Sequence, residues 1–259
     1  MSTFSNVSLL ITHYNRSSSL ERLLLRFQEL DFNFHEIIVS DDGSKPEHLE
    51  RLVEMQSLYN YILVTTIQNK GLGNNINKGQ DKVTAKYTLY VQEDFVPKDL
   101  FETEFAVSLK LMEKDARFDM VRYYAYFKYP YLKPYHGNFS EMIFSSWPWY
   151  TGYKKFYYYS DHPHLRRTNF YEKFGRYAEG IPVERTEYRM MMSFIQKKGK
   201  ALFYNDINGL FTQENSSSEP STVQRNYWRN TKNPLIVVIK HSYRYLKFHL
   251  DFHLQNKTI

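Results

Sequence analysis

Residues 87–94 read Tyr-Thr-Leu-Tyr-Val-Gln-Glu-Asp, an apolar run that ends in an amide and two carboxylates. Three earlier apolar runs are also followed by loops rich in acids, amides or glycine. These runs and loops are 7–11 with 12–16, 37–39 with 40–44, and 61–64 with 69–73. Short continuous apolar runs are typical of strands that are buried on both faces of a sheet.

Helical patterns fill the gaps between these strands. The predicted helices run from Ser17–Ser19 to Leu30, from Pro46 to Gln56, from Asn74 to Val83 and from Asp99 to about Lys114. Strands that alternate with helices through short links predict an α/β fold with a mostly parallel sheet. Such sheets bind ligands at their carboxyl edge, so the four loops form the candidate site.

Composition narrows the class of protein. The chain has 259 residues, 42% of them hydrophobic and 24% charged, which is typical of a globular enzyme. Cysteine is absent, which excludes a disulfide scaffold, a thiolate zinc site and a cysteine nucleophile. The sequence shows neither a signal-peptide pattern nor ~18 consecutive apolar residues, so we expect a cytoplasmic protein, with the inner face of the membrane as an alternative location. The net charge of +6 suits an anionic surface, but no motif indicates a nucleic-acid partner.

The loops resemble those of family 2 glycosyltransferases with a GT-A fold, over roughly residues 5–210. The matching residues are Thr12, Tyr14, Asn15 and Arg16 after the first strand, Val39, Asp41, Asp42, Gly43 and Ser44 after the second, and Asn69, Gly71, Gly73 and Asn75 after the third. Each motif alone is a common turn, but four of them in order, each at a predicted strand end, are specific.

The resemblance implies a nucleotide-sugar donor, with UDP favoured as the nucleotide. It places Asp41 and Asp42 against uracil and ribose, although either could instead cap the helix after Gly43. Tyr14 offers a ring for the base, and Arg16 a charge for Asp41, Asp42 or phosphate. The remaining members of this predicted nucleotide-binding set are Thr12, Asn15, Asn69, Gly71, Gln92 and Glu93.

The family's Asp-x-Asp element aligns with Gln92, Glu93 and Asp94. The resemblance makes Asp94 the ligand of Mn²⁺ or Mg²⁺ on the diphosphate, where the metal would offset charge on the leaving group. Gln92 replaces the first carboxylate, which predicts weaker metal binding. Side chains alternate along a strand, so we expect Glu93 to point away from Asp94.

Inverting transfer requires a base that deprotonates the acceptor hydroxyl. Members of this family often carry Glu-Asp about 12 residues before a glycine at the end of a helix. Here the helix is predicted over 183–198 and the motif reads Thr186-Glu187-Tyr188, so Glu187 is the candidate base. Glu184, one turn earlier on the same face, is the second candidate. Alternatively, both acids only stabilise the helix dipole.

We divide the chain into a nucleotide-sugar-binding half (1–121), an acceptor-binding and catalytic half of the same domain (122–233), and a C-terminal helix (234–259). Residues 123–159 hold nearly half of the chain's 23 tyrosines together with Trp147 and Trp149. These aromatics could form a core, or a surface that stacks on sugar rings, or both.

Residues 160–167, Ser-Asp-His-Pro-His-Leu-Arg-Arg, form another polar cluster. His162 and His164 lack an evident third ligand, so zinc is a weak alternative. We expect Arg166 or Arg167 near the diphosphate. Residues 224–228, Gln-Arg-Asn-Tyr-Trp, resemble the Gln-x-x-Arg-Trp element of processive synthases but lack its arginine, which favours addition of a single sugar.

The C-terminal helix is predicted to be amphipathic. One face carries Ile236, Ile239, Tyr243, Leu246 and Leu250, another carries Lys240, Arg244 and Lys247, and Tyr245, Phe248 and Phe252 border the apolar stripe. Such a helix suits a membrane interface. Packing on the catalytic domain or on a second subunit is the alternative.

Together these features predict a metal-dependent inverting glycosyltransferase that moves one sugar to a hydroxyl of a glycan or lipid-linked acceptor in surface polysaccharide synthesis. Because Gln92 and Tyr188 depart from the family pattern, a non-catalytic GT-A-like protein that binds nucleotide or glycan is the alternative.

Overall fold

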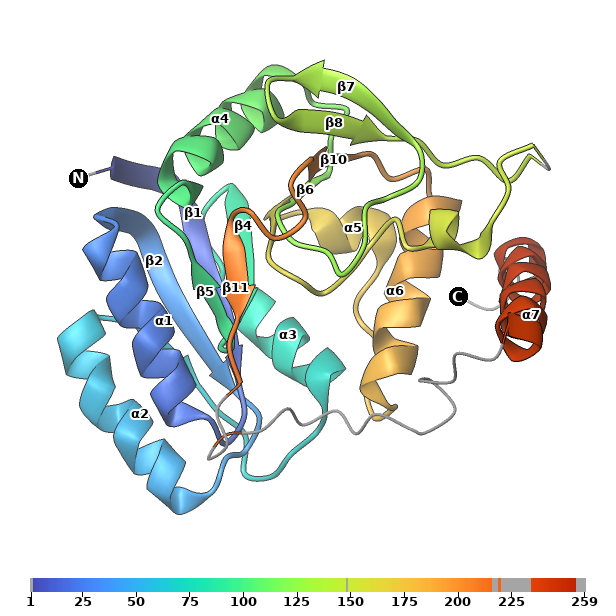
Figure 1. Cartoon of the computed structure of the whole chain (residues 1–259). Coiled ribbons are helices and arrows are strands. Elements are labelled where there is room, and N and C mark those ends of the chain that lie inside the picture. The colour runs from blue at the N-terminus through green and yellow to red at the C-terminus, as the bar shows by residue number, and fades with distance from the viewer. Residues whose placement is uncertain (1, 148, 216–218, 220–233, 255–259) are drawn as a thin grey trace.

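The computed structural model describes residues 2–147, 149–215, 219 and 234–254 (Figure 1). Within this part of the chain, nine strands form one sheet in the order β3-β2-β1-β4-β9-β6-β10-β8-β7. Residues 224–228, which resemble the Gln-x-x-Arg-Trp element, lie outside the described residues.

The N-terminal half confirms the predicted α/β pattern. Its strands β1 (Ser2–His13), β2 (Phe32–Asp41), β3 (Ile62–Val64) and β4 (Tyr87–Gln92) are parallel, and α1 (Ser17–Glu29), α2 (Pro46–Tyr59) and α3 (Leu72–Gln80) connect them. Pro46 opens α2 as predicted. The register pairs Thr12 with Gln92 and His13 with Asp41, so the predicted loops meet at one edge.

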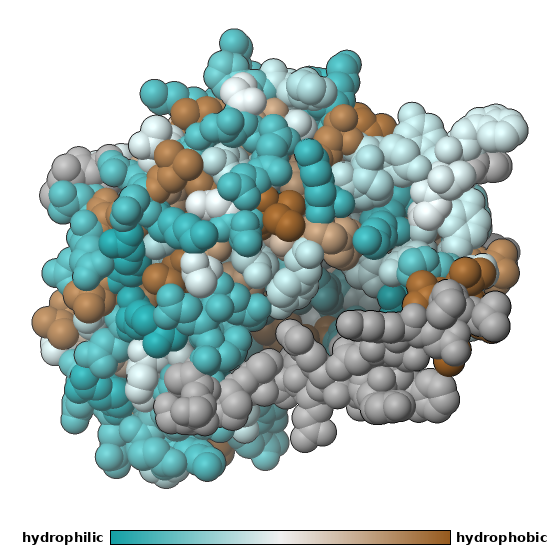
Figure 2. Space-filling model, in the orientation of Figure 1, coloured by the Kyte–Doolittle hydropathy of each residue, from teal (hydrophilic) through white to brown (hydrophobic). Residues whose placement is uncertain are grey.

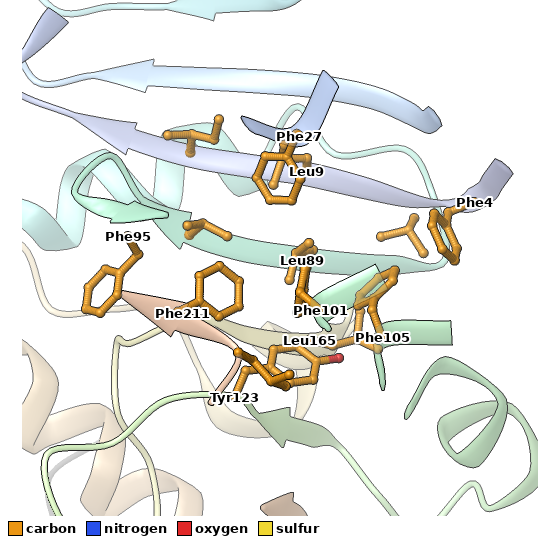
Figure 3. Packing of buried hydrophobic residues seen from close by; sticks show 14 of the residues in the cluster. Phe4, Leu9, Phe27, Leu89, Phe95, Phe101, Phe105, Tyr123, Leu165 and Phe211 are labelled. Carbon is orange, nitrogen blue, oxygen red and sulfur yellow. The ribbon is translucent and has the colours of Figure 1, made fainter. Parts of the chain in front are cut away.

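Helices cover both faces of this sheet because its central strands are apolar on both sides. Leu9 and Leu89 face the layer of α1 and α4 (Phe101–Lys114), where Phe27, Phe101 and Phe105 bury their rings (Figure 3). The alternate strand residues, such as Leu10 and Tyr90, face the opposite layer, to which α3 and α6 (Val183–Gln196) belong. This two-sided burial explains the continuous apolar runs.

The second half extends the same sheet. The added strands are β6 (Met120–Arg122), β7 (Leu132–His136), β8 (Phe139–Met142), β9 (His164–Arg167) and β10 (Ala201–Tyr204). β6 and β10 are parallel, whereas β9 runs antiparallel to β4 and β6, and β8 runs antiparallel to β7 and β10. A small separate sheet, which the sequence did not predict, pairs β5 (Phe95–Pro97) with β11 (Phe211–Gln213).

The aromatic segment serves both as a core and as a surface. Tyr158 and Tyr159 are buried in the same core layer as residues of η1 (Tyr153–Phe156) and α5 (Phe170–Phe174). Tyr123 is buried in the opposite layer, where it packs on Phe101 and Phe211. Trp147 and Trp149 are instead 60% and 79% exposed. The predicted aromatic core is therefore present, and exposed rings remain available for a ligand.

Helix α7 (Pro234–Leu254) lies against α6 and η1 at one side of the molecule (Figure 1). The residues that bordered the predicted apolar stripe make this contact, with Phe248 packing on Tyr153, Phe156 and Tyr188. None of the described helices is long and apolar enough to cross a membrane.

Candidate active site

The carboxylate that ends β2 organises two of the predicted loops. Asp41 is fully buried, and its Oδ1 accepts from His13 Nδ1 (2.8 Å) and from the Ser44 hydroxyl. Its Oδ2 accepts from the backbone N–H groups of Gly43 and Ser44 (both 3.0 Å) and from the Thr65 hydroxyl (2.9 Å). Burial alone would raise the pKa of Asp41, but the hydrogen bonds from His13 and Ser44 lower it to about 2.

His13 carries its proton on Nδ1. Its Nε2 accepts the backbone N–H of Arg16 (3.1 Å), which leaves Nδ1 to donate to Asp41. Burial is the main cause that lowers the pKa of His13, so the ring is neutral near pH 7. The imidazole therefore links the first loop to the second by two hydrogen bonds.

Asp42 holds the third loop. Its Oδ1 accepts the N–H of Lys70 and its Oδ2 the N–H of Gly71, both at 2.9 Å. Gly71 has φ of +86°, a conformation that glycine adopts readily. Asn69 Oδ1 also accepts the Gly71 N–H (3.2 Å), so the side chains predicted to contact nucleotide shape the loop itself.

Of the other candidates in the first loop, Asn15 and Thr12 make hydrogen bonds within the fold, and Tyr14 is partly exposed. Asn15 has φ of +54° and accepts the backbone N–H of Lys45 through Oδ1 (2.8 Å). The Thr12 hydroxyl is buried against the Tyr90 hydroxyl (3.0 Å). Tyr14 is only half-buried, so its ring is the one in this loop best placed to stack on a base.

Arg16 lies beside the carboxylates of Glu93 and Asp94. Its Nη1 is 3.3 Å from Asp94 Oδ2 and 3.6 Å from Glu93 Oε1, and its Nη2 donates to Asn215 Oδ1 (2.6 Å) and to the Glu219 carbonyl (3.1 Å). These contacts replace the predicted pairing with Asp41 or Asp42, whose oxygens accept hydrogen bonds from the loops. The other role predicted for Arg16, a contact with phosphate, stays a prediction.

Glu93 also differs from its prediction. Strand β4 ends at Gln92, so Glu93 and Asp94 lie in a turn, where side chains do not alternate as they do along a strand. Both carboxylates therefore face Arg16, and Glu93 does not point away from Asp94. Burial, followed by the charge of Asp94, raises the pKa of Glu93 to about 8.

Asp94 can serve as part of a metal site. Its carboxylate is nearly buried, and Oδ2 accepts from Gln213 Nε2 (2.9 Å) in addition to the Arg16 contact. Within the described ranges, no group of three or more His, Cys, Asp or Glu residues is arranged to hold an ion. One carboxylate fits the mode in which Mg²⁺ or Mn²⁺ takes most of its other ligands from substrate phosphates and water.

Glu187 lies in the first turns of α6 and is half-buried. Its Oε1 accepts the backbone N–H of Asp161 (3.3 Å). Burial raises its pKa, whereas hydrogen bonds from Ser160 and Asp161 and the charge of Arg122 oppose that rise. Glu184 is exposed, so Glu187 has the more suitable surroundings for a base.

The segment 160–162 contacts both Glu187 and the residue that follows Asp94. The His162 ring packs on Phe95, the residue after Asp94, with the ring centroids 5.7 Å apart. The zinc alternative gains no support, because His164 Nδ1 bonds the His162 carbonyl (2.8 Å) rather than converging on an ion. Burial lowers the pKa of His162 to about 3, which keeps it neutral.

The expectation that Arg166 or Arg167 lies near the diphosphate was wrong. Strand β9 runs antiparallel to β4 and pairs Arg167 with Tyr87, at the end of β4 farthest from Asp94. Arg166 is fully buried, where it donates to Gln80 (2.7 Å) and Tyr177 (2.6 Å), and Arg167 binds backbone carbonyls such as Met112 O (2.6 Å).

Several residues of the site had no family motif to mark them. His13 lies inside the Thr12–Arg16 turn, but only the structure shows that it bridges the first two loops. Asp161 belongs to the polar cluster 160–167, in which the histidines and arginines drew attention first. Gln213 and Asn215 reach Asp94 and Arg16 from about 120 and 200 residues away in sequence, a contact no local pattern reveals.

Comparisons with known proteins agree with this geometry. The model of glycosyl transferase family 2 matches residues 8–192. Poly-β-1,6-N-acetyl-D-glucosamine synthase of Staphylococcus aureus is 26% identical over 90 residues, or 35% of this chain and 22% of the synthase, and that of Staphylococcus epidermidis is 27% identical over 93 residues, or 36% and 23%. The chain therefore matches less than a quarter of the length of these relatives.

Solved structures show the same fold. TarS 1-349 of S. aureus in complex with UDP-GlcNAc superposes with a TM-score of 0.61 and 16% identity, over 95% of this chain and 73% of that one. The mannosyltransferase PcManGT of Pyrobaculum calidifontis, in complex with GDP-Man and Mn²⁺, gives 0.57 and 14%, over 97% and 70%.

The fold and the edge-of-sheet site define a GT-A glycosyltransferase. The chain belongs to glycosyl transferase family 2, as the motifs predicted.

The Asp41 network predicts a stability effect with a defined pH dependence. Asp41→Asn places an amide NH₂ against backbone donors, and we expect the free energy of unfolding at pH 7 to fall by about 1–3 kcal/mol. Asp41 is more acidic folded than unfolded, so it stabilises above its unfolded pKa of about 3.9, and this contribution is lost as pH falls towards 2. In urea unfolding, the free energies of unfolding of variant and wild type should therefore approach each other as pH falls through this range.

Asp81→Asn is the matched control, because Asp81 is a half-exposed aspartate paired with Arg176 and should change stability little. If Asp41→Asn leaves stability unchanged but weakens UDP binding, Asp41 is a ligand contact and not the support of the loops.

Proposed function

We propose that the chain is a metal-dependent inverting glycosyltransferase that moves one sugar from a nucleotide-sugar, with UDP favoured, to a hydroxyl of a glycan or lipid-linked acceptor in surface polysaccharide synthesis. The observation that carries the proposal is the meeting of the predicted loops, Arg16 and Asp94 at the carboxyl ends of the parallel strands β1, β2 and β4.

The donor would lie along the loops after β1, β2 and β3. Tyr14 is the ring for the base, while Asp41 and Asp42 keep the surrounding backbone in place and leave it less freedom to lose on binding. The half-exposed Gln92 and the exposed Asn69 offer amides for ribose or base. Complexes of structural neighbours with UDP-GlcNAc and with GDP-Man support a nucleotide-sugar donor and leave the base open.

Arg16 and a metal ion held by Asp94 would neutralise part of the charge of the diphosphate. A divalent ion held by Asp94 and by donor phosphates would supply positive charge near the leaving group. Arg16, at 3.3 Å from Asp94, is close enough to contact the same phosphates once its carboxylate partner turns to the metal. The Mn²⁺ in the PcManGT complex is consistent with this arrangement.

Glu187 would be the catalytic base, on the acceptor side formed by residues 122–233. The pKa of its half-buried carboxyl is raised, which suits proton transfer near neutral pH. The exposed rings of Trp147, Trp149 and Tyr126 offer flat faces for a glycan acceptor.

Release of UDP from UDP-sugars and of GDP from GDP-sugars, with and without Mn²⁺, tests the function. Wild type should turn over at least one donor in a metal-stimulated reaction, and Asp94→Ala should lose the stimulated part, because it removes the protein's carboxylate ligand. Asp99→Ala is the control, since that side chain is 93% exposed and should leave turnover unchanged.

The outcomes separate the candidate functions. UDP binding without release of UDP from any donor would assign the chain to the non-catalytic alternative. Metal-stimulated turnover by Asp94→Ala equal to that of wild type would contradict the metal role of Asp94.

We also propose that α7 contacts an anionic membrane surface on which a lipid-linked acceptor is presented. The apolar stripe points outward: Ile239, Tyr243, Leu246 and Leu250 are 58–67% exposed. Figure 2 shows hydrophobic surface on the α7 side of the molecule. Arg244 and Lys247 turn instead towards Tyr153 and Asp251, so attraction to anionic lipid would rest on the net charge of +6 as well as on the helix.

Sedimentation with vesicles tests this surface. The double variant Leu246→Ser/Leu250→Ser should lose binding to vesicles that contain phosphatidylglycerol, because it removes apolar area from the stripe. Val53→Ser/Leu58→Ser on α2, at 60% and 67% exposure, is the matched control and should bind like wild type. If wild type ignores these vesicles at low salt, the membrane proposal is wrong, and a homodimer that the stripe variant dissociates would assign the surface to a second copy.

A further inference from the structure

A buried aspartate, Asp161, lies beside Glu187. Asp161 is 4% exposed, and its backbone N–H donates to Glu187 Oε1 at 3.3 Å. The Tyr159 hydroxyl donates to Asp161 Oδ1 at 2.9 Å. Asp161 Oδ2 is buried and has no hydrogen-bond partner among the described residues. An ionised oxygen in that position would bear the full cost of its lost hydration.

A proton on the Asp161 carboxyl removes its charge, and with it the cost of burying an ionised oxygen. Two neighbouring carboxylates in a buried site do not both ionise readily, and their surroundings decide which one keeps the charge. Glu187 receives hydrogen bonds from Ser160 and Asp161 and the field of Arg122, all of which favour its ionised form. Burial and then the charge of Glu187 raise the pKa of Asp161 well above its usual range, although the hydrogen bond from Tyr159 and the charge of Arg166 oppose this rise.

We propose that Asp161 and Glu187 form one acid–carboxylate pair, in which Asp161 holds a proton and thereby leaves the negative charge on Glu187. Asp161 also acts as a positioning residue, because its hydrogen bond with Tyr159 fixes the segment whose backbone N–H holds Glu187. The proposal rests on the proposed function, in which Glu187 is the base. During transfer the proton of the acceptor hydroxyl passes to Glu187, and the pair then holds two protons until one is lost to solvent.

The titration of the pair can be distinguished from that of the groups around it. The charged neighbours are Arg122 and Arg166, with Glu184 one helical turn away. His162 and His164 have pKa values lowered mainly by burial, and Tyr90, Tyr159 and Tyr177 have pKa values raised mainly by burial. Between pH 5 and pH 8 these histidines and tyrosines therefore stay neutral.

The sign of the stability effect follows from linkage. An acid that is weaker in the folded state than in the unfolded chain makes the fold lose stability as pH rises from its unfolded pKa towards its folded one. Asparagine at position 161 has no proton to lose. The stability of Asp161→Asn relative to wild type should therefore improve steadily from pH 5 to pH 8.

The experiment combines urea unfolding from pH 5 to pH 8 with steady-state kinetics for Asp161→Asn, Asp161→Leu, Glu187→Gln and wild type. In unfolding, the midpoint of Asp161→Asn should rise relative to wild type with pH. In kinetics, Glu187→Gln should lose on the order of 100-fold in kcat or more. The kcat of Asp161→Asn should fall less than that of Glu187→Gln. The kcat of Asp161→Leu should fall more than that of Asp161→Asn. The KM for the donor should be unchanged in the two Asp161 variants.

Each outcome decides a different claim. Parallel unfolding profiles of Asp161→Asn and wild type would overturn the pair. A kcat loss in Asp161→Asn as large as that in Glu187→Gln would make Asp161 the base and would also overturn it. If no donor is turned over while the unfolding profiles diverge as stated, the pair stands and the proposed function fails.

Discussion

The site depends on two adjacent carboxylates at the end of β2. Asp41 fixes the second loop and, through His13, the first, while Asp42 holds the backbone of the third. Each buried oxygen accepts at least one hydrogen bond, so moving any of these loops would leave a buried acceptor without its partner. This requirement keeps the carboxyl edge in one conformation, and the placement of Tyr14 and Arg16 follows from it.

Charge organises the turn that follows β4. Arg16 lies between Asp94 and Glu93, and residues 213, 215 and 219 reach it from the far end of the sequence. A guanidinium beside the carboxylates compensates part of their charge in the unliganded protein. Binding of a metal and a diphosphate would then exchange one set of charge partners for another, which costs less than stripping water from isolated carboxylates.

Local sequence was sufficient to predict the fold of the N-terminal half, because its apolar runs and the loops after them are local patterns. Apolar runs marked β1, β2 and β4, and each loop followed its strand, so the fold and the meeting of Thr12, Asp41 and Gln92 were predictable. The roles of the aspartates were harder to predict. Whether Asp41 contacts a ligand or supports a loop depends on how many donors surround it, and those donors come from residues 13, 43, 44 and 65.

The second half was predicted less well for a related reason. Antiparallel β9 enters the sheet between β4 and β6, and its direction moved Arg167 away from Asp94 while it brought Asp161 towards Glu187. The turn at Glu93 likewise ended the alternation that a continued strand would have imposed. Strand direction and strand length at these points depend on tertiary packing, which no single-sequence pattern encodes.

The most direct measurement is an anomalous difference map from a crystal of the protein with UDP and Mn²⁺. The account predicts a manganese peak within bonding distance of the Asp94 carboxylate, with the diphosphate on its other side and the uracil beside Tyr14 and the third loop. UDP bound elsewhere, or manganese bound away from Asp94, would contradict it.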